Sequence, residues 1–403
     1  MAKTPKIRFK NFSDEWVESR LDEIGDFQSN GVDKLSKPNE FKVNLLNYMD
    51  VYNQKNITAK NCNKLMQVTA TLNQLIKNNI LKGDVFFTPS SETPEDIGIS
   101  IAINENLPNT VYSYHLIRFR PQENILDVKF SNYVFNNNFV RKQMILSAQG
   151  IQRYVINKPN FEKIIFNYPN KKEQEKIGAF FSKLDKLISL HQSKFEKLQK
   201  IKKSCLQNLF PQNNQNTPKI RFKNFNDEWV ENKLGEICTI TMGQSPNGAT
   251  YSEIPSDYIL VQGNADLKNG FVCPRIWTTQ KTKMAYIGDL IMSVRAPAGA
   301  MGKTLHNVVL GRGVAGIKGN EFIYQNLIKF DMEGYWSSFS AGSTFESLNS
   351  NVIFNAKISI PNSKEQEKIG AFFSKLDKLI SLHQSKFEKL QKIKKSCLQN
   401  MFV

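Results

Sequence analysis

The sequence predicts an α+β fold: two globular domains with small twisted sheets, separated by a pair of long antiparallel coiled-coil helices with pseudo-two-fold symmetry. Three observations lead to this prediction. The chain has 403 residues, which exceeds one ordinary domain of roughly 100 to 200 residues. Two blocks of its sequence occur twice. One of these blocks has the apolar spacing of a long helix.

The repeats give the chain an internal alignment. The first block, TPKIRFKNFSDEWVE at 4–18, recurs at 217–231 with one changed residue. The second block, KEQEKIGAFFSKLDKLISLHQSKFEKLQKIKKSCLQN at 172–208, recurs at 364–400 without any change. Self-similarity of this extent indicates that one structural unit is present twice.

The stretches between the repeats differ from each other in sequence and length. Both nevertheless contain a Gly-Asp pair followed by apolar residues, at Gly83 and Gly288. We therefore predict one fold carrying two different sets of surface loops. The resulting parts are an N-terminal edge segment, a first variable domain, a central helix, a linker with the second edge segment, a second variable domain and a C-terminal helix, at 1–18, 19–171, 172–208, 209–231, 232–363 and 364–403.

The repeated helix resembles a coiled-coil arm, although an ordinary core helix is an alternative. Apolar residues recur at spacings of three and four without an intervening proline. At 1.5 Å per residue such a helix would reach about 55 Å. Two identical arms can pair about an axis near residue 190. The predicted seam consists of Ile177, Phe180, Leu184, Leu187, His191, Leu198 and Ile201 in one arm and Phe372, Leu376, Leu379, His383, Leu390 and Ile393 in the other.

The two-fold axis makes a specific prediction about the histidines of the arms. It places His191 close to His383, where one polar pair could fix the register of the helices. The alternative is that both histidines are partly exposed and never meet.

The composition indicates an ordered protein with a polyanionic or acidic partner. Lys and Arg number 54 against 37 Asp and Glu, which gives a formal net charge of +17 at pH 7. The five cysteines are scattered without a C-x-x-C pair, so they predict neither disulfides nor a zinc site and fit a cytoplasmic location. No stretch is apolar enough to predict a membrane span.

Two glycine-rich motifs resemble nucleotide-binding loops but lack the required context. PAGAMGKT at 297–304 has a proline in place of the first P-loop glycine, and a strand is predicted where a helix should follow. The glycines at 311, 313 and 316 spell G-x-G-x-x-G, but no convincing helix follows them. We predict turns or loops between strands at both places.

The repeated RFKNF sequence of the edge segments interleaves basic and aromatic residues. This pattern could provide base stacking. The alternation of Ile7 and Phe9 with charged residues instead favours a short half-buried strand, covered by Trp16 and by Trp229 in the second copy. Because both copies match, any DNA contact here is expected to involve phosphates rather than bases.

In their order and duplication, these features resemble the DNA-sequence-specificity (S) subunits of type I restriction-modification systems. The resemblance rests on the SDEWVE and NDEWVE edges, the Gly-Asp signatures and the KEQEKIGAFFSKLDKLISL helices preceded by Pro169 and Pro361. It covers essentially the whole chain, and none of its motifs is catalytic. It implies two target-recognition domains in a non-catalytic subunit that recognises a bipartite, asymmetric DNA sequence.

The resemblance also implies partners. These are double-stranded DNA, two adenine methyltransferase subunits and ATP-dependent restriction and translocase subunits. S-adenosylmethionine, ATP and Mg are then expected only in the partner subunits, and this chain is expected to hold no cofactor or metal. The alternatives are an autonomous DNA methyltransferase, which the absence of an N-P-P-[FY] signature disfavours, and a coiled-coil adaptor without sequence preference.

Base-reading residues are expected in the segments that differ between the two copies. Arg, Lys, Asn, Gln, Ser and Thr on exposed loops match the donors and acceptors of the DNA grooves. The candidates in the first domain are Asn47, Ser90, Ser91, Gln152 and Arg153. Those in the second domain are Arg275, Arg295, Lys303, Arg312 and Thr344. For each of them, simple solvation is the alternative.

Overall fold

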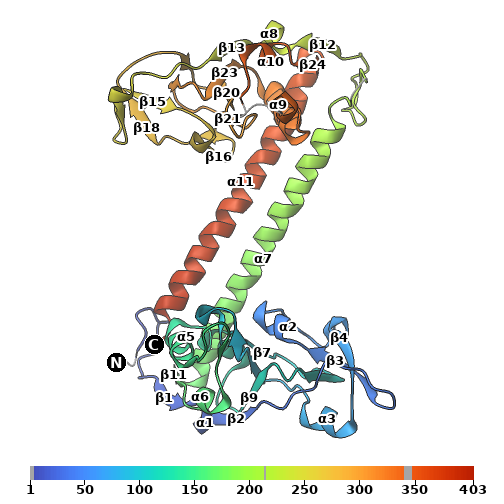
Figure 1. Ribbon diagram of the computed structural model, residues 1–403, viewed down its shortest axis with the longest axis vertical. Helices are drawn as coiled ribbons and strands as arrows, with labels where there is room; N and C mark the ends of the chain where they lie inside the picture. The colour runs from blue at the N-terminus through green and yellow to red at the C-terminus, as the bar shows by residue number, and fades with distance from the viewer. Residues whose placement is uncertain (1–3, 213–214, 340–346) are drawn as a thin grey trace. The chain divides into compact units, whose positions relative to one another are not determined.

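The computed structural model describes residues 4–212, 215–339 and 347–403. The chain forms two compact units, the first containing Met1–Leu190 and Phe387–Val403 and the second His191–Lys386. Two long helices, α7 (Lys171–Asn208) and α11 (Ser363–Asn400), each contribute one part to each unit (Figure 1). Each helix begins one residue before its repeated block and ends at the last residue of that block.

The first unit contains two main sheets. One has the order β2-β9-β5-β7 and the other the order β4-β3-β8, in which β3 and β8 are parallel. Two strand pairs, β1-β11 and β6-β10, complete the unit. The strands are β1 (Val17–Arg20), β2 (Gly25–Gln28), β3 (Phe41–Leu46), β4 (Met66–Ala70), β5 (Val85–Phe87), β6 (Ser90–Ser91), β7 (Ser100–Ala102), β8 (Thr110–Tyr112), β9 (Ile117–Pro121), β10 (Tyr154–Val155) and β11 (Ile165–Tyr168). The helices are α1 (Leu21–Ile24), α2 (Tyr48–Tyr52), α3 (Leu72–Lys77), α4 (Val128–Val134), α5 (Asn138–Ser147) and α6 (Lys158–Glu162).

The second unit repeats this strand order and extends it. Its larger sheet has the order β13-β23-β20-β21-β17-β16, and its other sheet has the order β14-β18-β15-β22-β19 with β15 parallel to β22. The strands are β12 (Val230–Lys233), β13 (Thr239–Met242), β14 (Tyr251–Ser252), β15 (Tyr258–Val261), β16 (Leu267–Lys268), β17 (Phe271–Val272), β18 (Ile276–Thr278), β19 (Met284–Ala285), β20 (Leu290–Ser293), β21 (Met301–Lys303), β22 (Val308–Leu310), β23 (Val314–Lys318) and β24 (Lys357–Ile360). The helices are α8 (Leu234–Ile237), α9 (Glu321–Met332) and α10 (Ser350–Phe354).

The strands of the second unit show whether the two glycine-rich motifs have the structure of nucleotide-binding loops. The end of PAGAMGKT forms β21, and strand β22 follows it, so the helix that a P-loop requires is not there. The last glycine of the G-x-G-x-x-G motif lies within β23. Both motifs therefore connect or form strands, as predicted.

Each unit has an aromatic core built around a tryptophan of the repeated edge segment. Trp16 lies edge-on against Phe402, with ring centroids 6.2 Å apart. In the second unit Trp229 lies edge-on against Phe210 at the same distance, 6.2 Å. Trp16 and Trp229 are 2% and 3% exposed. In both units, therefore, residues that follow the end of a long helix complete a core that also contains an edge segment.

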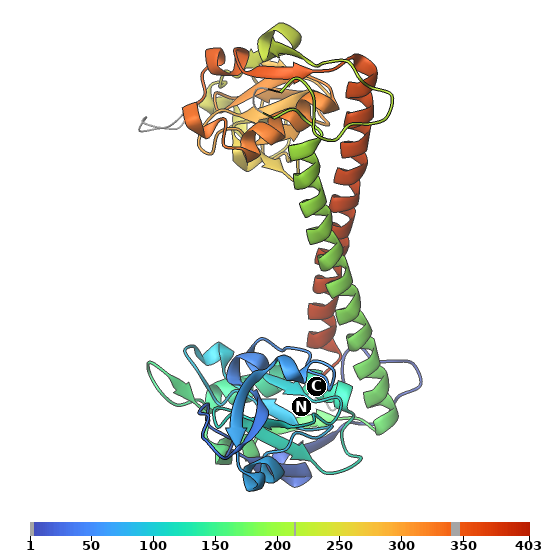
Figure 2. The same ribbon diagram turned by 90° about the vertical axis from the view of Figure 1, so that its right-hand side faces the viewer.

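The RFKNF segment is not a strand, which corrects the prediction made from its alternation. No strand occurs between residue 4 and β1, and Ile7 is 47% exposed. The Ile7 N–H instead donates to the carbonyl oxygen of Asn400 at the end of α11 (2.9 Å), beside the C-terminus in Figure 2. The Ile220 N–H makes the same bond to Asn208 at the end of α7 (2.9 Å). The residue just before each RFKNF copy therefore satisfies a helix-end carbonyl group.

Buried ion pairs attach the edge segments to the N-terminal turns of the long helices. The Arg8 guanidinium donates from Nε and Nη2 to the two carboxylate oxygens of Glu173, at 2.7 and 2.8 Å. Arg221 binds Glu365 in the same way, at 2.8 and 2.7 Å. Both glutamate side chains are fully buried. The repeated sequences thus form repeated contacts.

The long helices pair antiparallel in both units. Lys394 lies 2.6 Å from Asp185 in the first unit, and Lys202 lies 2.6 Å from Asp377 in the second. The Nδ1 atoms of His191 and His383 are 2.8 Å apart within the second unit, as the two-fold axis predicted. As residue numbers rise along α7, the numbers of their partners on α11 fall, which defines the antiparallel direction.

The predicted seam is only partly buried. Ile177, Leu184 and Leu376 are buried, whereas Phe180, His191, Leu198, Phe372, His383 and Leu390 are half-buried. The departure from the prediction is that Leu187, Ile201, Leu379 and Ile393 are exposed, by 37%, 39%, 46% and 38%. Two helices can cover only a narrow strip of each other, which leaves these four side chains partly open to solvent.

Candidate nucleic-acid interface

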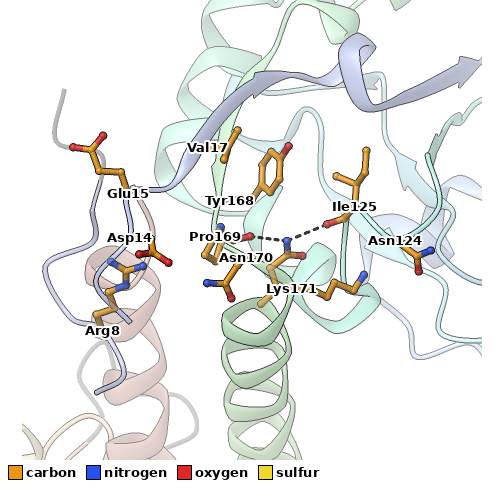
Figure 3. Close-up of a pocket in the computed structure, with 11 residues that line it drawn as sticks. Arg8, Asp14, Glu15, Val17, Asn124, Ile125, Tyr168, Pro169, Asn170 and Lys171 are labelled. Carbon is orange, nitrogen blue, oxygen red and sulfur yellow. Dashed lines mark hydrogen bonds between the residues drawn. The ribbon is translucent and has the colours of Figure 1, made fainter. Parts of the chain in front are cut away.

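A recess of about 420 Å³ lies at the N-terminal end of α7 (Figure 3). Its lining includes Arg8, which is bonded to Glu173, and Lys171. The side-chain amide of Gln174 donates to the carbonyl oxygens of Ile125 and Pro169, at 3.0 and 2.9 Å. No group of three or more His, Cys, Asp and Glu residues suited to a metal occurs in the described parts of the chain. The hydrogen bonds described at this recess therefore hold α7 to its neighbours.

A second feature is an open edge of the first unit, which we call the first loop edge: Tyr48, Ser90, Tyr114, His115 and Arg153. The Tyr48 hydroxyl donates to the carbonyl oxygen of Ser90 (2.5 Å), and the Arg153 guanidinium donates to the Ser90 hydroxyl (3.4 Å). The Tyr114 and His115 rings have centroids 4.0 Å apart. Burial lowers the pKa of His115, and the charges of Lys34 and Arg153 lower it further. The edge thus combines rings, hydroxyl groups and one arginine.

The second unit has a corresponding edge, the second loop edge, formed by Ser245, Arg295 and Arg312. Arg312 follows β22 directly after a glycine, and its N–H donates to the Ser245 hydroxyl (3.1 Å). Arg295 follows β20 and forms an antiparallel bridge with Ser347. The side chains of both arginines are exposed.

The two loop edges occupy the same position in the repeated fold. Tyr114 is the second residue after β8, and Arg312 is the second residue after β22, the strands that run parallel to β3 and β15. Ser90 and Arg295 each stand six residues after the aspartate of the Gly-Asp pair. Ser90 pairs with Val155 just as Arg295 pairs with Ser347. The fold therefore presents different side chains at equivalent points.

The arginines support the loop edges as the candidate nucleic-acid interface. The chain has ten arginines. Seven donate to a carboxylate or carbonyl oxygen: Arg8, Arg20, Arg118, Arg120, Arg141, Arg221 and Arg275. The other three, Arg153, Arg295 and Arg312, all lie on the loop edges. The guanidinium groups of Arg295 and Arg312 have no hydrogen-bond or ion-pair partner among residues 4–212, 215–339 and 347–403.

The remaining first-domain candidates differ in their availability. Asn47 caps α2, accepting a hydrogen bond from the Tyr48 N–H at 2.8 Å. Ser91 is 6% exposed, and its hydroxyl donates to the carbonyl oxygen of Thr93, so it is not free to reach a groove. Gln152 is exposed beside Arg153.

The remaining second-domain candidates are mostly engaged within the protein. Arg275 donates to the buried Asp266 (2.9 Å). Lys303 donates to Glu321 (2.8 Å), and its ammonium group lies 4.4 Å from the centre of the Tyr324 ring. Thr344 lies outside the described residues.

Sequence reasoning missed the aromatic part of the first loop edge. Tyr48, Tyr114 and His115 were not predicted because only Arg, Lys, Asn, Gln, Ser and Thr were considered as base-reading residue types. Tyr114 is 50% exposed. Tyr114 lies 31 residues after Gly83 and Arg312 lies 24 residues after Gly288, so only the strands of the structure pair the two positions.

Comparison with known proteins identifies the family. The model of the type I restriction modification DNA specificity domain matches residues 13–202 and 226–393, which include most of both units. This chain belongs to that family. A putative type I restriction enzyme specificity subunit, MjaX, from Methanocaldococcus jannaschii is 26% identical over 336 residues, which cover 80% of this chain and 78% of the relative. The MjaVIII specificity subunit of the same organism is 23% identical and covers 72% of each chain.

Solved structures have the same fold over nearly the whole length. The S subunit of a type I restriction-modification system from M. genitalium gives a TM-score of 0.66 at 17% identity and covers 99% of both chains. A chain from a structure on complex assembly and conformational transition of the type I R-M system gives 0.51 at 19% identity, with 95% and 96% covered. As a type I specificity subunit, the protein is a non-catalytic recognition component. None of the helices in the described parts combines the length and apolar character needed to cross a bilayer.

Proposed function

We propose that this specificity subunit recognises a bipartite, asymmetric sequence in double-stranded DNA, with one half read by each unit. The observation that carries the proposal is the pair of loop edges. They occupy equivalent points of a repeated fold and carry different side chains, Tyr114 in one and Arg312 in the other. Two copies of one scaffold with unlike edges suit two unlike half-sites. The net charge of +17 favours the phosphate backbone as the shared part of the target.

We further propose that the subunit directs two adenine methyltransferase subunits and ATP-dependent restriction subunits to that sequence. Exposed apolar residues of the long helices support a partner that binds twice. Leu187, Leu190 and Ile393 are exposed in the first unit, and their repeat equivalents Leu379, Leu382 and Ile201 are exposed in the second. S-adenosylmethionine, ATP and Mg would act in those partner subunits. Location in the cytoplasm, where such a complex meets DNA, belongs to the same proposal.

Exchange of one variable segment tests the bipartite assignment. Residues 19–171 are replaced by the corresponding segment of a relative, and methylated sites are mapped genome-wide in cells that contain the partner subunits. One half of the methylated motif should change while the other half is retained. The reciprocal exchange of residues 232–363 is the matched control and should change the opposite half. A change of both halves by either exchange contradicts the proposal.

Two other measurements separate the alternatives. Calorimetry of the purified chain with S-adenosylmethionine should detect no binding, since binding would indicate an autonomous methyltransferase. Duplex DNA that contains the mapped motif should bind the complete complex more tightly than a scrambled duplex of equal length. Equal binding would indicate an adaptor without sequence preference.

A further inference from the structure

Arg312 lies in a tightly held turn. The Gly311 N–H donates to the carbonyl oxygen of Val261 (2.8 Å), and the Arg312 N–H donates to the Ser245 hydroxyl (3.1 Å). A Cβ atom on Gly313 would lie only 2.0 Å from a carbonyl oxygen, so the backbone approaches its neighbour as closely as glycine permits. The backbone of Arg312 is therefore fixed from both sides while its side chain is exposed.

The guanidinium of Arg312 has two possible DNA targets. Arginine can bind a phosphate, which carries no sequence information, or donate two hydrogen bonds to O6 and N7 of guanine in the major groove. A phosphate contact would serve both units equally, and the fold would then be expected to keep the same residue at both equivalent points. The equivalent residue of the first unit is instead Tyr114, whose single hydroxyl cannot form the two-pronged contact.

We propose that Arg312 is a specificity-determining residue that reads one guanine of the half-site bound by the second unit. This inference rests on the proposed function and adds to it the base and the residue. The fixed turn removes backbone freedom at Arg312, which reduces the entropy lost when two directional hydrogen bonds form. The first half-site is then read at the equivalent place by Tyr114 without a two-pronged guanine contact.

The test combines protein variants with altered bases. The complete complex is assembled with wild-type chain, Arg312→Ala, Arg312→Lys or Lys318→Ala, after the motif has been mapped with the wild type. Lys318 is the matched control because it is an exposed cation at the other end of β23, the strand that begins just after Arg312. Binding is measured to duplexes in which each guanine of the motif is replaced singly by 7-deazaguanine, which lacks the N7 acceptor.

We expect one replacement to weaken wild-type binding by roughly 5- to 150-fold, which corresponds to 1–3 kcal/mol at 1.4 kcal/mol per tenfold. Arg312→Ala should lose that sensitivity and accept other base pairs at the same position, and Arg312→Lys should also discriminate less because ammonium lacks the planar fork. Lys318→Ala should keep the wild-type pattern.

Three results would overturn the assignment of Arg312. The first is a second half-site without guanine. The second is a uniform loss of binding to all duplexes in Arg312→Ala that Arg312→Lys restores, which is the behaviour of a phosphate contact. The third is no change in either variant. Failure of the proposed function would look different, because the wild-type complex would then show no split sequence preference at all.

Discussion

Removal of Arg8 should selectively destabilise the first unit. Its guanidinium makes two short bonds to Glu173, whose side chain is 0% exposed, while the Arg8 side chain is 13% exposed. Arg8→Ala leaves this carboxylate buried without its counter-charge. Breaking a buried pair in this way costs about 3–5 kcal/mol. In a domain of this size, 1 kcal/mol shifts the melting temperature by about 2–4 °C, so the expected decrease is about 6–20 °C.

Calorimetry of the full chain measures the decrease, and hydrogen exchange assigns it to a unit. Arg8→Ala should lower the transition of the first unit, and Arg221→Ala, which leaves Glu365 unpaired, should lower that of the second. Glu173→Gln in the Arg8→Ala background should recover part of the loss because the unpaired charge is removed. The exposed neighbour Lys10 is the control, and Lys10→Ala should melt like the wild type.

Equal melting temperatures for Arg8→Ala and Lys10→Ala would refute the reasoning. Such a result would mean that water reaches the Glu173 carboxylate in solution. A loss of stability that hydrogen exchange places equally in both units would also contradict it, because each ion pair joins elements of one unit only.

Three further predictions concern the helices and the core they complete. Gly178→Ala should destabilise the first unit more than Gly370→Ala destabilises the second, although both stand in the same helix sequence, because the nearest atom would lie 2.7 Å from the new Cβ in one case and 3.0 Å in the other; urea unfolding of the two variants compares them. Burial, followed by the nearby His191, lowers the pKa of His383. The folded state therefore disfavours charged His383. The free energy of unfolding should decrease as the pH falls through the ordinary histidine pKa of about 6.5. In His383→Gln this decrease should be smaller. Phe402→Ala should lower the free energy of unfolding of the first unit by about 3–5 kcal/mol, because it opens a cavity beside the aromatic core. The same urea titration measures this change, and a decrease no larger than that of Lys10→Ala would contradict the packing of Phe402.

The sequence predicted the helices well because their signals are local or repeated. The 3-4 spacing identifies a helix without knowledge of its neighbours, and the identity of the arms leads to the contact between His191 and His383. The RFKNF prediction failed for the opposite reason. Its backbone partner, Asn400, is almost a full chain length away from Ile7, so alternation within a few residues could not reveal it.

The candidate site was predictable by residue type but not by selection among residues. Arg153, Arg295 and Arg312 were selected as candidates because arginines in variable loops match DNA chemistry. Lys303 and Arg275 satisfied the same criterion, yet folding brings a carboxylate to each of them. Which cations are free is decided by the tertiary neighbours, and these are not encoded in the local pattern.

The closure of the first unit by Phe402 sets the order of events during synthesis on the ribosome. The segment that ends at Leu190 leaves the exit tunnel long before the residues that complete its core, including Phe402. At about 5–20 residues per second, this interval is roughly 10–40 s. During that time the side of Trp16 that Phe402 later covers lacks its partner, and the entire second unit is made. The half of the protein that is translated first is thus the half that matures last.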